Sequence, residues 1–180
     1  MNLVCVYAPQ VGKTLEDKEE FLLLFSRTIS GISGKERLVI GGDFNCHVGS
    51  DAEGYEGVHG GHGFGQRNVE GEMLLELATA LELVVVNTCF KKRVSQKVTY
   101  ESGEARTVVE MVRRQGRAMV RDAKVIPGEP ALLQHRLVVC ELVVQEGVKR
   151  TKDQFVSRVW ILKNAGVRTR FEDQVKVKAA

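Results

Sequence analysis

The sequence predicts a mixed α/β (α+β) fold, and two patterns along its 180 residues carry this prediction. In the first half, short apolar strands alternate with helices, whereas strand-like segments separated by glycine or proline dominate from about residue 98 onward. Hydrophobic residues make up 43% and charged residues 27%, which is typical of a globular domain. We therefore expect one mixed sheet structure with flanking helices.

Start and stop signals delimit the elements of the first half. Pro9 ends the first strand because proline has no N–H to donate to a sheet. Thr14 is an expected N-cap followed by acidic residues, and Asn68 stands near the start of a second helix. The expected elements are a strand at 3–7, a helix from 14 to 31, a strand at 37–40, a glycine-rich loop at 49–65, a helix at 70–81 that buries Met73, Leu74, Leu77 and Leu81, and a strand at 83–86.

The second half is expected to be rich in strands. Candidates lie at 98–100, 106–112, 120–126 and 137–144. After about residue 145 the composition becomes polar and basic, which indicates a linker or a short helix near 167–177. We expect one domain over 1–145 and a basic tail over 146–180.

Charge and composition limit the possible partners and locations. The formal charge is +3, and two basic groups could neutralise phosphates or simply form a solvated surface. No apolar run approaches the roughly 20 residues of a membrane helix, and the N-terminus lacks signal-peptide features, so an intracellular protein without membrane contact is expected. The four cysteines are scattered and are expected to be reduced and structural. The basic groups are Arg113, Arg114, Arg117, Arg121 and Lys124, and Lys149, Arg150, Lys152 and Arg158.

Asp43 and Asn45 are the residues most suited to chemistry. They follow a buried strand at positions i and i+2, which places both side chains on one side of an extended backbone. A carboxylate there can bind metal or accept a proton, and a carboxamide can donate a hydrogen bond to a phosphate oxygen. The alternative is an ordinary turn in which an aspartate closes the strand.

Two other motifs are weaker. Gly12–Lys13–Thr14 imitates the end of a phosphate-binding loop, but Tyr7 stands where the first glycine is required. His59 and His62 could be metal ligands, yet their glycine-rich surroundings favour a flexible surface loop.

Several motifs together resemble the endonuclease/exonuclease/phosphatase superfamily. Gly42–Asp43–Phe44–Asn45 is similar to its G-D-x-N motif, Val6–Tyr7–Ala8–Pro9 to its V-Y-x-P strand end, and Gln134–His135 stands where its terminal histidine motif is found. The segments 65–68, 84–88, 99–100 and 124–128 resemble endonuclease domains of LINE-type (non-LTR) retrotransposons and their craniofacial development protein 2-like relatives. The stretch 158–163 is similar to the segment that leads to the reverse transcriptase.

The resemblance implies a two-sheet sandwich and Mg²⁺-assisted (or Mn²⁺-assisted) hydrolysis of a phosphodiester in DNA. Asp43 would orient or deprotonate the attacking water and bind metal, and Asn45 would hold the scissile phosphate. His135 would hydrogen-bond a phosphate oxygen, and Tyr7 would touch the phosphate. Glu110 lies nearest to an acid that supports the metal in the family. A nuclear location is implied as well.

This chain departs from the family pattern in three ways. Met1 stands directly before the V-Y-x-P strand, so the first strands and their metal-binding glutamate are missing, and residues 1–145 would form a partial domain. The strand around Glu110 is about two residues shorter, and Gln134 replaces an acid. A weakly active or inactive endonuclease-type hydrolase is therefore expected. A non-catalytic remnant that binds nucleic acid or protein, or a fragment that does not fold alone, is the alternative, and an exposed sheet edge would allow self-association.

Overall fold

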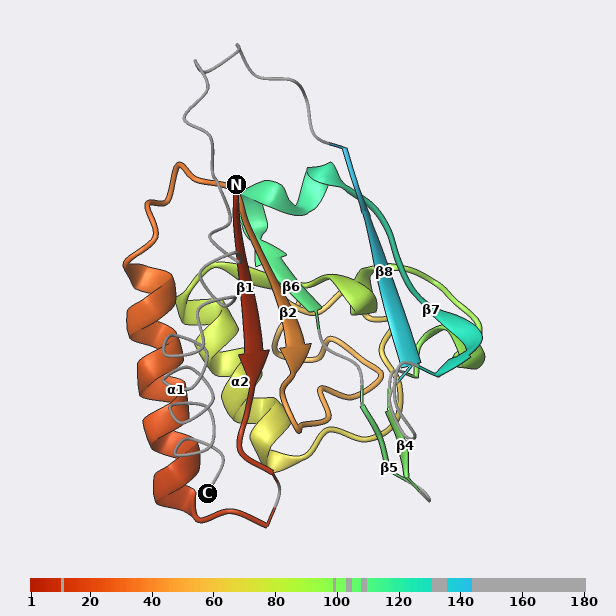
Figure 1. Cartoon of the computed structure of the whole chain (residues 1–180), viewed down its shortest axis with the longest axis horizontal. Coiled ribbons are helices and arrows are strands. Elements are labelled where there is room, and N and C mark those ends of the chain that lie inside the picture. The colour runs from red at the N-terminus through yellow and green to blue at the C-terminus, as the bar shows by residue number, and fades with distance from the viewer. Residues whose placement is uncertain (11, 99, 103–104, 108–109, 131–135, 144–180) are drawn as a thin grey trace, which may run out of the picture. The chain divides into compact units, whose positions relative to one another are not determined.

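Figure 1 shows the computed structural model of the chain, whose described residues all precede residue 144. They are residues 1–10, 12–98, 100–102, 105–107, 110–130 and 136–143. For 100–102, 105–107, 110–115 and 127–130 only the backbone is described. The expected boundary at residue 145 and the expected helix at 167–177 thus lie outside the described residues and stay predictions.

A four-stranded sheet has the strand order β1-β2-β6-β3. β1 (Asn2–Tyr7) and β2 (Leu38–Asp43) are parallel and are connected through α1 (Leu15–Ser30). β6 (Glu110–Arg113) lies between β2 and β3 (Leu83–Val85) and is antiparallel to both. β1 and β3 are therefore the two edges of this sheet.

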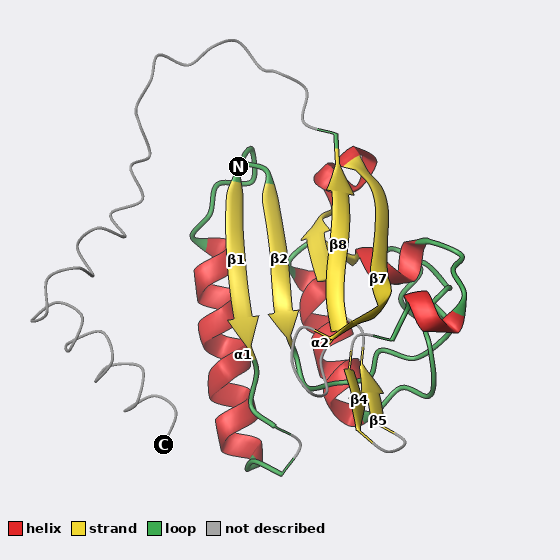
Figure 2. Ribbon diagram, turned by 45° about the vertical axis from the view of Figure 1, so that its right-hand side comes forward, coloured by secondary structure: helices red, strands yellow, loops and turns green. Residues whose placement is uncertain are grey.

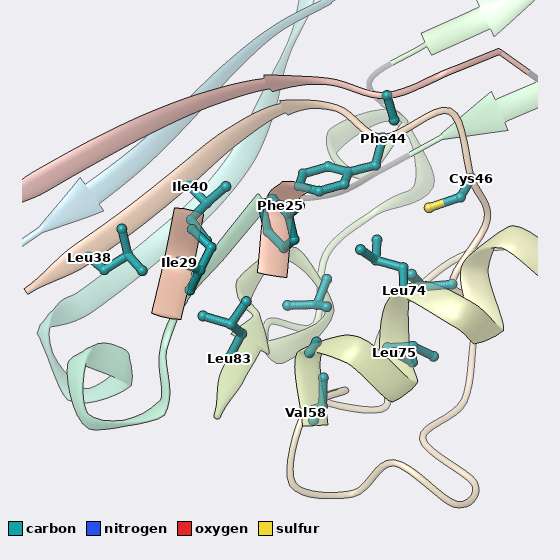
Figure 3. Close-up of a cluster of buried hydrophobic side chains, with 14 residues drawn as sticks. Phe25, Ile29, Leu38, Ile40, Phe44, Cys46, Val58, Leu74, Leu75 and Leu83 are labelled. Atoms are coloured by element: carbon teal, nitrogen blue, oxygen red, sulfur yellow. The ribbon is translucent and has the colours of Figure 1, made fainter. Parts of the chain in front are cut away.

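Both helices cover one face of this sheet. Phe25 and Ile29 of α1 pack on Ile40 of β2, and α2 (Val69–Ala80) contributes Leu74 and Leu75 to the same core. Figure 3 shows these side chains converging between the helices and the strands. Because side chains alternate along a strand, the odd-numbered residues of β1 and β2 point to the other face.

The other face is partly covered by an antiparallel hairpin of β7 (Val120–Pro130) and β8 (Arg136–Leu142). Val39 of β2 packs there with Val86, Val120 and Leu142. The result is a partial two-sheet sandwich with helices on its outer side, as the sequence predicts. The remaining elements are the 3₁₀ turns η1 (Val86–Cys89), η2 (Val94–Gln96) and η3 (Arg114–Met119), and a hairpin of β4 (Tyr100–Ser102) and β5 (Ala105–Thr107).

The expected helix caps are confirmed. The Thr14 hydroxyl accepts the Asp17 N–H at 3.1 Å, while the Asp17 carboxylate accepts the Thr14 N–H at 3.2 Å. This reciprocal capping box closes the N-terminus of α1, and Gly31 caps its C-terminus. Asn68 caps α2 by accepting the Gly71 N–H at 2.9 Å.

One expectation for the secondary structure is wrong, and another is confirmed only in part. The single strand expected at 106–112 is divided between β5 and β6, which pair with different partners in different sheets. The buried face of α2 consists of Gly71, Leu74, Leu75 and Ala78, whereas Met73, Leu77 and Leu81 are only partly buried. Gly71 lies on the buried side, where it approaches the backbone of residue 47 so closely that a Cβ atom at Gly71 would overlap the His47 carbonyl.

The cysteines and the helices were also examined for disulfide bonds and for membrane spans. All four cysteines are free thiols, with Cys46 buried and Cys5 exposed. Among the described residues, no helix has the length and apolar character to cross a bilayer.

Candidate functional site

The candidate site lies where the parallel strands β1 and β2 end. Their register pairs Tyr7 with Asp43, so two residues 36 positions apart become direct neighbours. The Ala8 N–H continues this pairing by donating to the Asp43 carbonyl at 2.8 Å. Tyr7 is 67% exposed and Asp43 is half-buried, so both can meet a ligand from solvent.

Gly42 permits this close pairing. Its φ is +154°, and a Cβ atom at this position would overlap the backbone carbonyl of Val6 on the neighbouring strand. A Cβ atom at Gly41 would instead lie in open space. The strand end therefore requires glycine at 42 and not at 41.

Asp43 and Asn45 form a tight turn directly after β2. Asp43 Oδ1 accepts the Asn45 N–H at 2.9 Å, and Asn45 has a φ of +47°, a conformation that asparagine tolerates better than most residues. Asn45 Nδ2 donates to the Ala8 carbonyl at 2.7 Å, which ties the loop after β2 to the loop after β1. The ordinary turn that was the alternative to a functional site is thus present. The same turn follows the pairing of Asp43 with Tyr7 and holds the Asn45 side chain on the Ala8 carbonyl.

An apolar hollow lies beside the strand ends, on the side of the helices. Pro9, Phe21 and Phe44 line it, and the ion pair between Lys18 and Glu70, at 2.8 Å, stands in its wall. The hydrogen bond from Lys18 lowers the pKa of Glu70 below its ordinary value. Sequence reasoning missed this pair, because its members are 52 positions apart and no local pattern marks either of them.

Cys46, directly after Asn45, is buried in the hydrophobic core. Burial raises the pKa of its thiol to about 12, and the negative charges of Asp43 and Glu70 add to this shift. The thiol is therefore neutral at physiological pH and is not a nucleophile at this site.

The other predicted site residues are placed only in part. The backbone of Glu110 pairs with Gly41, two residues before Asp43 along β2, so it begins β6 at the same end of the sheet. His135 lies outside the described residues. Among the side chains that the structure describes, no three His, Cys, Asp or Glu residues are grouped as a metal site.

Of the two histidines expected in a surface loop, His62 is exposed, whereas His59 is buried. His59 is 2% exposed, its Nε2–H donates to the Gly49 carbonyl at 3.2 Å, and its Nδ1 accepts the Gly61 N–H at 3.0 Å. Burial lowers the pKa of His59 below 6.5, although the Gly49 carbonyl acts in the opposite direction. Both ring nitrogens are thus used within the loop, and His59 is a structural residue instead of a metal ligand.

Two residues outside the loop hold it in place. Arg67 donates to the carbonyls of Val48, Asp51 and Glu53 at 3.2–3.3 Å and lies 4.8 Å from the centre of the Tyr55 ring. The buried Thr88 hydroxyl accepts the Gly60 N–H at 2.8 Å and donates to the Val85 carbonyl at 2.6 Å. Both belong to segments on which the family resemblance rests, and both have a clear role in folding.

Several described basic residues between Lys92 and Lys124 have partners within the protein. Arg117 lies over the Phe90 ring at 4.8 Å and donates to the Val120 carbonyl at 3.2 Å. Lys92 and Lys124 both pair with Asp122, and although burial would raise the pKa of that carboxyl, the two lysines lower it below its ordinary value. These contacts favour structural ion pairs over a free basic surface.

Comparisons with known proteins place the fold. No family model and no curated protein matches the sequence. A solved structure of the 3′ phosphatase NExo from Neisseria bound to a product DNA hairpin is similar with a TM-score of 0.56 and 16% identity, over 79% of this chain and 61% of that one. The endonuclease domain of TRAS1, a telomere-specific non-LTR retrotransposon, has a TM-score of 0.49 and 16% identity, over 78% of this chain and 57% of its own. The chain thus has an endonuclease/exonuclease/phosphatase-type fold and spans about three fifths of the NExo structure.

Proposed function

We propose that this chain carries a phosphodiester hydrolase site of the DNA endonuclease type, located where β1 and β2 end. The observation that carries the proposal is the register of the two strands, which sets Tyr7 directly beside Asp43. Ligands of open α/β sheets bind beyond the carboxyl ends of parallel strands. The similarity in fold to a phosphatase bound to DNA supports the same class of substrate.

Each residue has a role that its chemistry permits. The Asp43 carboxylate would orient the attacking water or accept its proton, since it is half-buried and held by the Asn45 N–H. Asn45 has a second amide N–H beyond the one that binds Ala8, and it would donate this hydrogen to the phosphate. Tyr7 would contact the phosphate from the neighbouring strand, and His135 would stabilise the charge that develops on it.

The donor set suits a weakly held Mg²⁺ or Mn²⁺ ion. Magnesium sites often use one or two carboxylates and keep several waters. Asp43 supplies one carboxylate, and Glu110, which begins the adjacent strand β6, is the proposed second ligand. When bound, the ion would neutralise charge on the phosphate oxygens. With so few acidic ligands, this chain alone should hydrolyse DNA slowly or not at all. An origin in a LINE-like element and a nuclear location belong to the same proposal.

Metal binding tests the site without requiring activity. Titration of the ¹⁵N-labelled chain with Mn²⁺ should broaden the amide signals of residues 7–8 and 43–45 first. Asp43→Asn should abolish this broadening, because the amide keeps the turn and removes the charge. Asp51→Asn is a matched control, since Asp51 makes the same type of turn with the Glu53 N–H at 3.1 Å. Broadening that persists in Asp43→Asn would refute the assignment of the site.

Nicking of supercoiled plasmid in Mg²⁺ tests the chemistry. We expect little nicking, and any that occurs should be lost in Asp43→Asn and kept in Asp51→Asn. Robust nicking that depends on Asp43 would support the site and disprove the expected weakness of this chain. DNA binding that falls with salt but needs neither metal nor Asp43 would instead favour the non-catalytic remnant.

A further inference from the structure

An exposed segment, residues 91–97, runs between two anchored ends. Phe90 packs against a buried cluster directly before it, and Val98, which is 2% exposed, follows directly after it. The segment has no regular structure over 91–93 and then makes the single turn η2 beside β7, where Figure 2 shows short helical turns. Ser95 lies in this turn and is exposed, so a partner in solvent can reach it.

The charges that precede Ser95 are distinctive. Lys91, Lys92 and Arg93 form the only run of three basic residues in the chain, and Val94 alone separates this run from Ser95. Kinases that accept basic substrates have an acidic peptide groove, and they recognise positive charges two and three positions before the acceptor serine. Ser95 has arginine and lysine at these two positions.

The backbone before Ser95 has the extended form in which such a groove binds its substrate. Phe90 has φ −123° and ψ 130°, and Arg93 has φ −68° and ψ 152°. Ser30 offers a contrast, because Arg27 stands three positions before it but both residues belong to α1. A kinase would have to unwind that helix, whereas the chain before Ser95 requires no such change.

Lys92 can enter an acidic groove without leaving a carboxylate unpaired. It pairs with one oxygen of Asp122, and Lys124 donates to the other oxygen of this carboxylate at 3.1 Å. If Lys92 leaves, Asp122 keeps Lys124 as its partner. The release therefore exchanges one ion pair of Lys92 for another.

We propose that Ser95 is phosphorylated by a serine kinase that selects basic substrates. Ser95 Oγ forms a bond to the γ-phosphorus of ATP, the bond from this phosphorus to the oxygen shared with the β-phosphate breaks, ADP leaves, and a kinase carboxylate takes the hydroxyl proton. The segment 91–97 carries four positive charges, and a phosphoserine would cancel about half of them. The modification would thus lower the attraction of this segment for polyanions. The proposal is independent of the function proposed above.

Phosphorylation of the full chain in vitro tests the site. The probe is the catalytic subunit of cAMP-dependent protein kinase with ATP and Mg²⁺. The wild-type chain should be phosphorylated on Ser95, as located by peptide mass mapping, and Ser95→Ala should lose this label. Ser50→Ala removes an exposed serine that has no lysine or arginine in the three positions before it, and it should keep the label. An equal label in Ser95→Ala and the wild type would overturn the proposal.

Rates of phosphorylation test how the site is recognised. Arg93→Gln should lower kcat/KM by at least about tenfold, because a charged hydrogen bond to the kinase is lost. Arg27→Gln removes an exposed arginine elsewhere and should change kcat/KM by less than about twofold. Gly42→Ala destabilises the pairing of β1 with β2 and should leave the rate unchanged, because the folded chain is the substrate. A faster rate in Gly42→Ala, or equal rates for Arg93→Gln and the wild type, would refute the proposal.

Discussion

Replacing His59 by glutamine should flatten the acid side of the curve of stability against pH. The folded chain holds this ring neutral, with Nε2–H donating to the Gly49 carbonyl and Nδ1 accepting the Gly61 N–H. Protonation would put a second N–H against the Gly61 donor inside a buried site. Burial accordingly lowers the pKa of His59 below its ordinary value of 6.5.

The sign of the effect follows from proton binding. Below pH 6.5 the unfolded chain takes up a proton on this histidine, whereas the folded chain does so only at lower pH. The contribution of the neutral His59 ring to the free energy of unfolding is therefore fully present above pH 6.5. It is lost as the pH falls from 6.5 toward the pKa of His59 in the folded chain. One proton corresponds to a slope of at most about 1.4 kcal/mol per pH unit, so a fall of one unit below 6.5 costs up to about 1.4 kcal/mol.

Urea unfolding between pH 5 and 8 measures this slope. The His59→Gln variant should lose about 1–3 kcal/mol at pH 8 through imperfect hydrogen bonding, but its stability should fall less steeply toward pH 5 than that of the wild type. His62→Gln is the matched control, because His62 is exposed in the same loop and should leave the slope unchanged. Equal slopes for the wild type and His59→Gln, or a His59 pKa at or above 6.5 by NMR, would refute the reasoning.

Three further experiments test other contacts. The first two measure thermal and urea unfolding of variants, and the third measures thiol labelling of the unchanged chain. Gly42→Ala should cost at least about 2 kcal/mol because its Cβ would overlap the Val6 carbonyl, whereas Gly41→Ala should stay within about 1 kcal/mol; equal losses would show that the strands do not approach as described. Arg67→Lys should cost about 1–3 kcal/mol, since lysine is unable to reach three carbonyls at once, and a neutral result would mean that the loop is held in another way. Cys46 should react with a thiol reagent only on unfolding, given its burial and a pKa of about 12, and labelling in the native state would contradict its position.

Local hydrogen bonds made the helix termini predictable from the sequence. The capping box of Thr14 and Asp17 and the cap at Asn68 form within four residues, so the residues that form them are visible in a short window. The end of β1 is predictable from a local feature as well. Pro9 has no N–H to donate, so it ends the strand regardless of which strand pairs with β1. The strand that leads to Asp43 was also expected, but it ends three residues later than residue 40, since Gly41 and Gly42 continue the pairing with β1.

Contacts between distant segments account for the failures. The segment 106–112 has the composition of one strand, and only its partners, β4 and β2, divide it in two. The glycine-rich loop looks flexible because the residues that order it, Arg67 and Thr88, lie outside it. In α2 the apolar residues cover more than one side of the helix, and the buried side includes Gly71, whose close approach to the distant His47 carbonyl no local pattern marks.

Folding explains some residues of the family resemblance and not others, and this difference supports the site proposed above. Arg67, Asn68 and Thr88 each satisfy backbone groups that would otherwise be unpaired, so their presence requires no catalytic role. Tyr7 is 67% exposed, and its hydroxyl accepts a long hydrogen bond, 3.4 Å, from the Gln10 amide. An exposed aromatic ring next to a half-buried carboxylate contributes little to the core, whereas both side chains stand where a substrate beyond the strand ends would contact them. The functional proposal therefore rests on Tyr7 and Asp43, and the metal and nicking experiments on Asp43 test it more directly than any further likeness in fold.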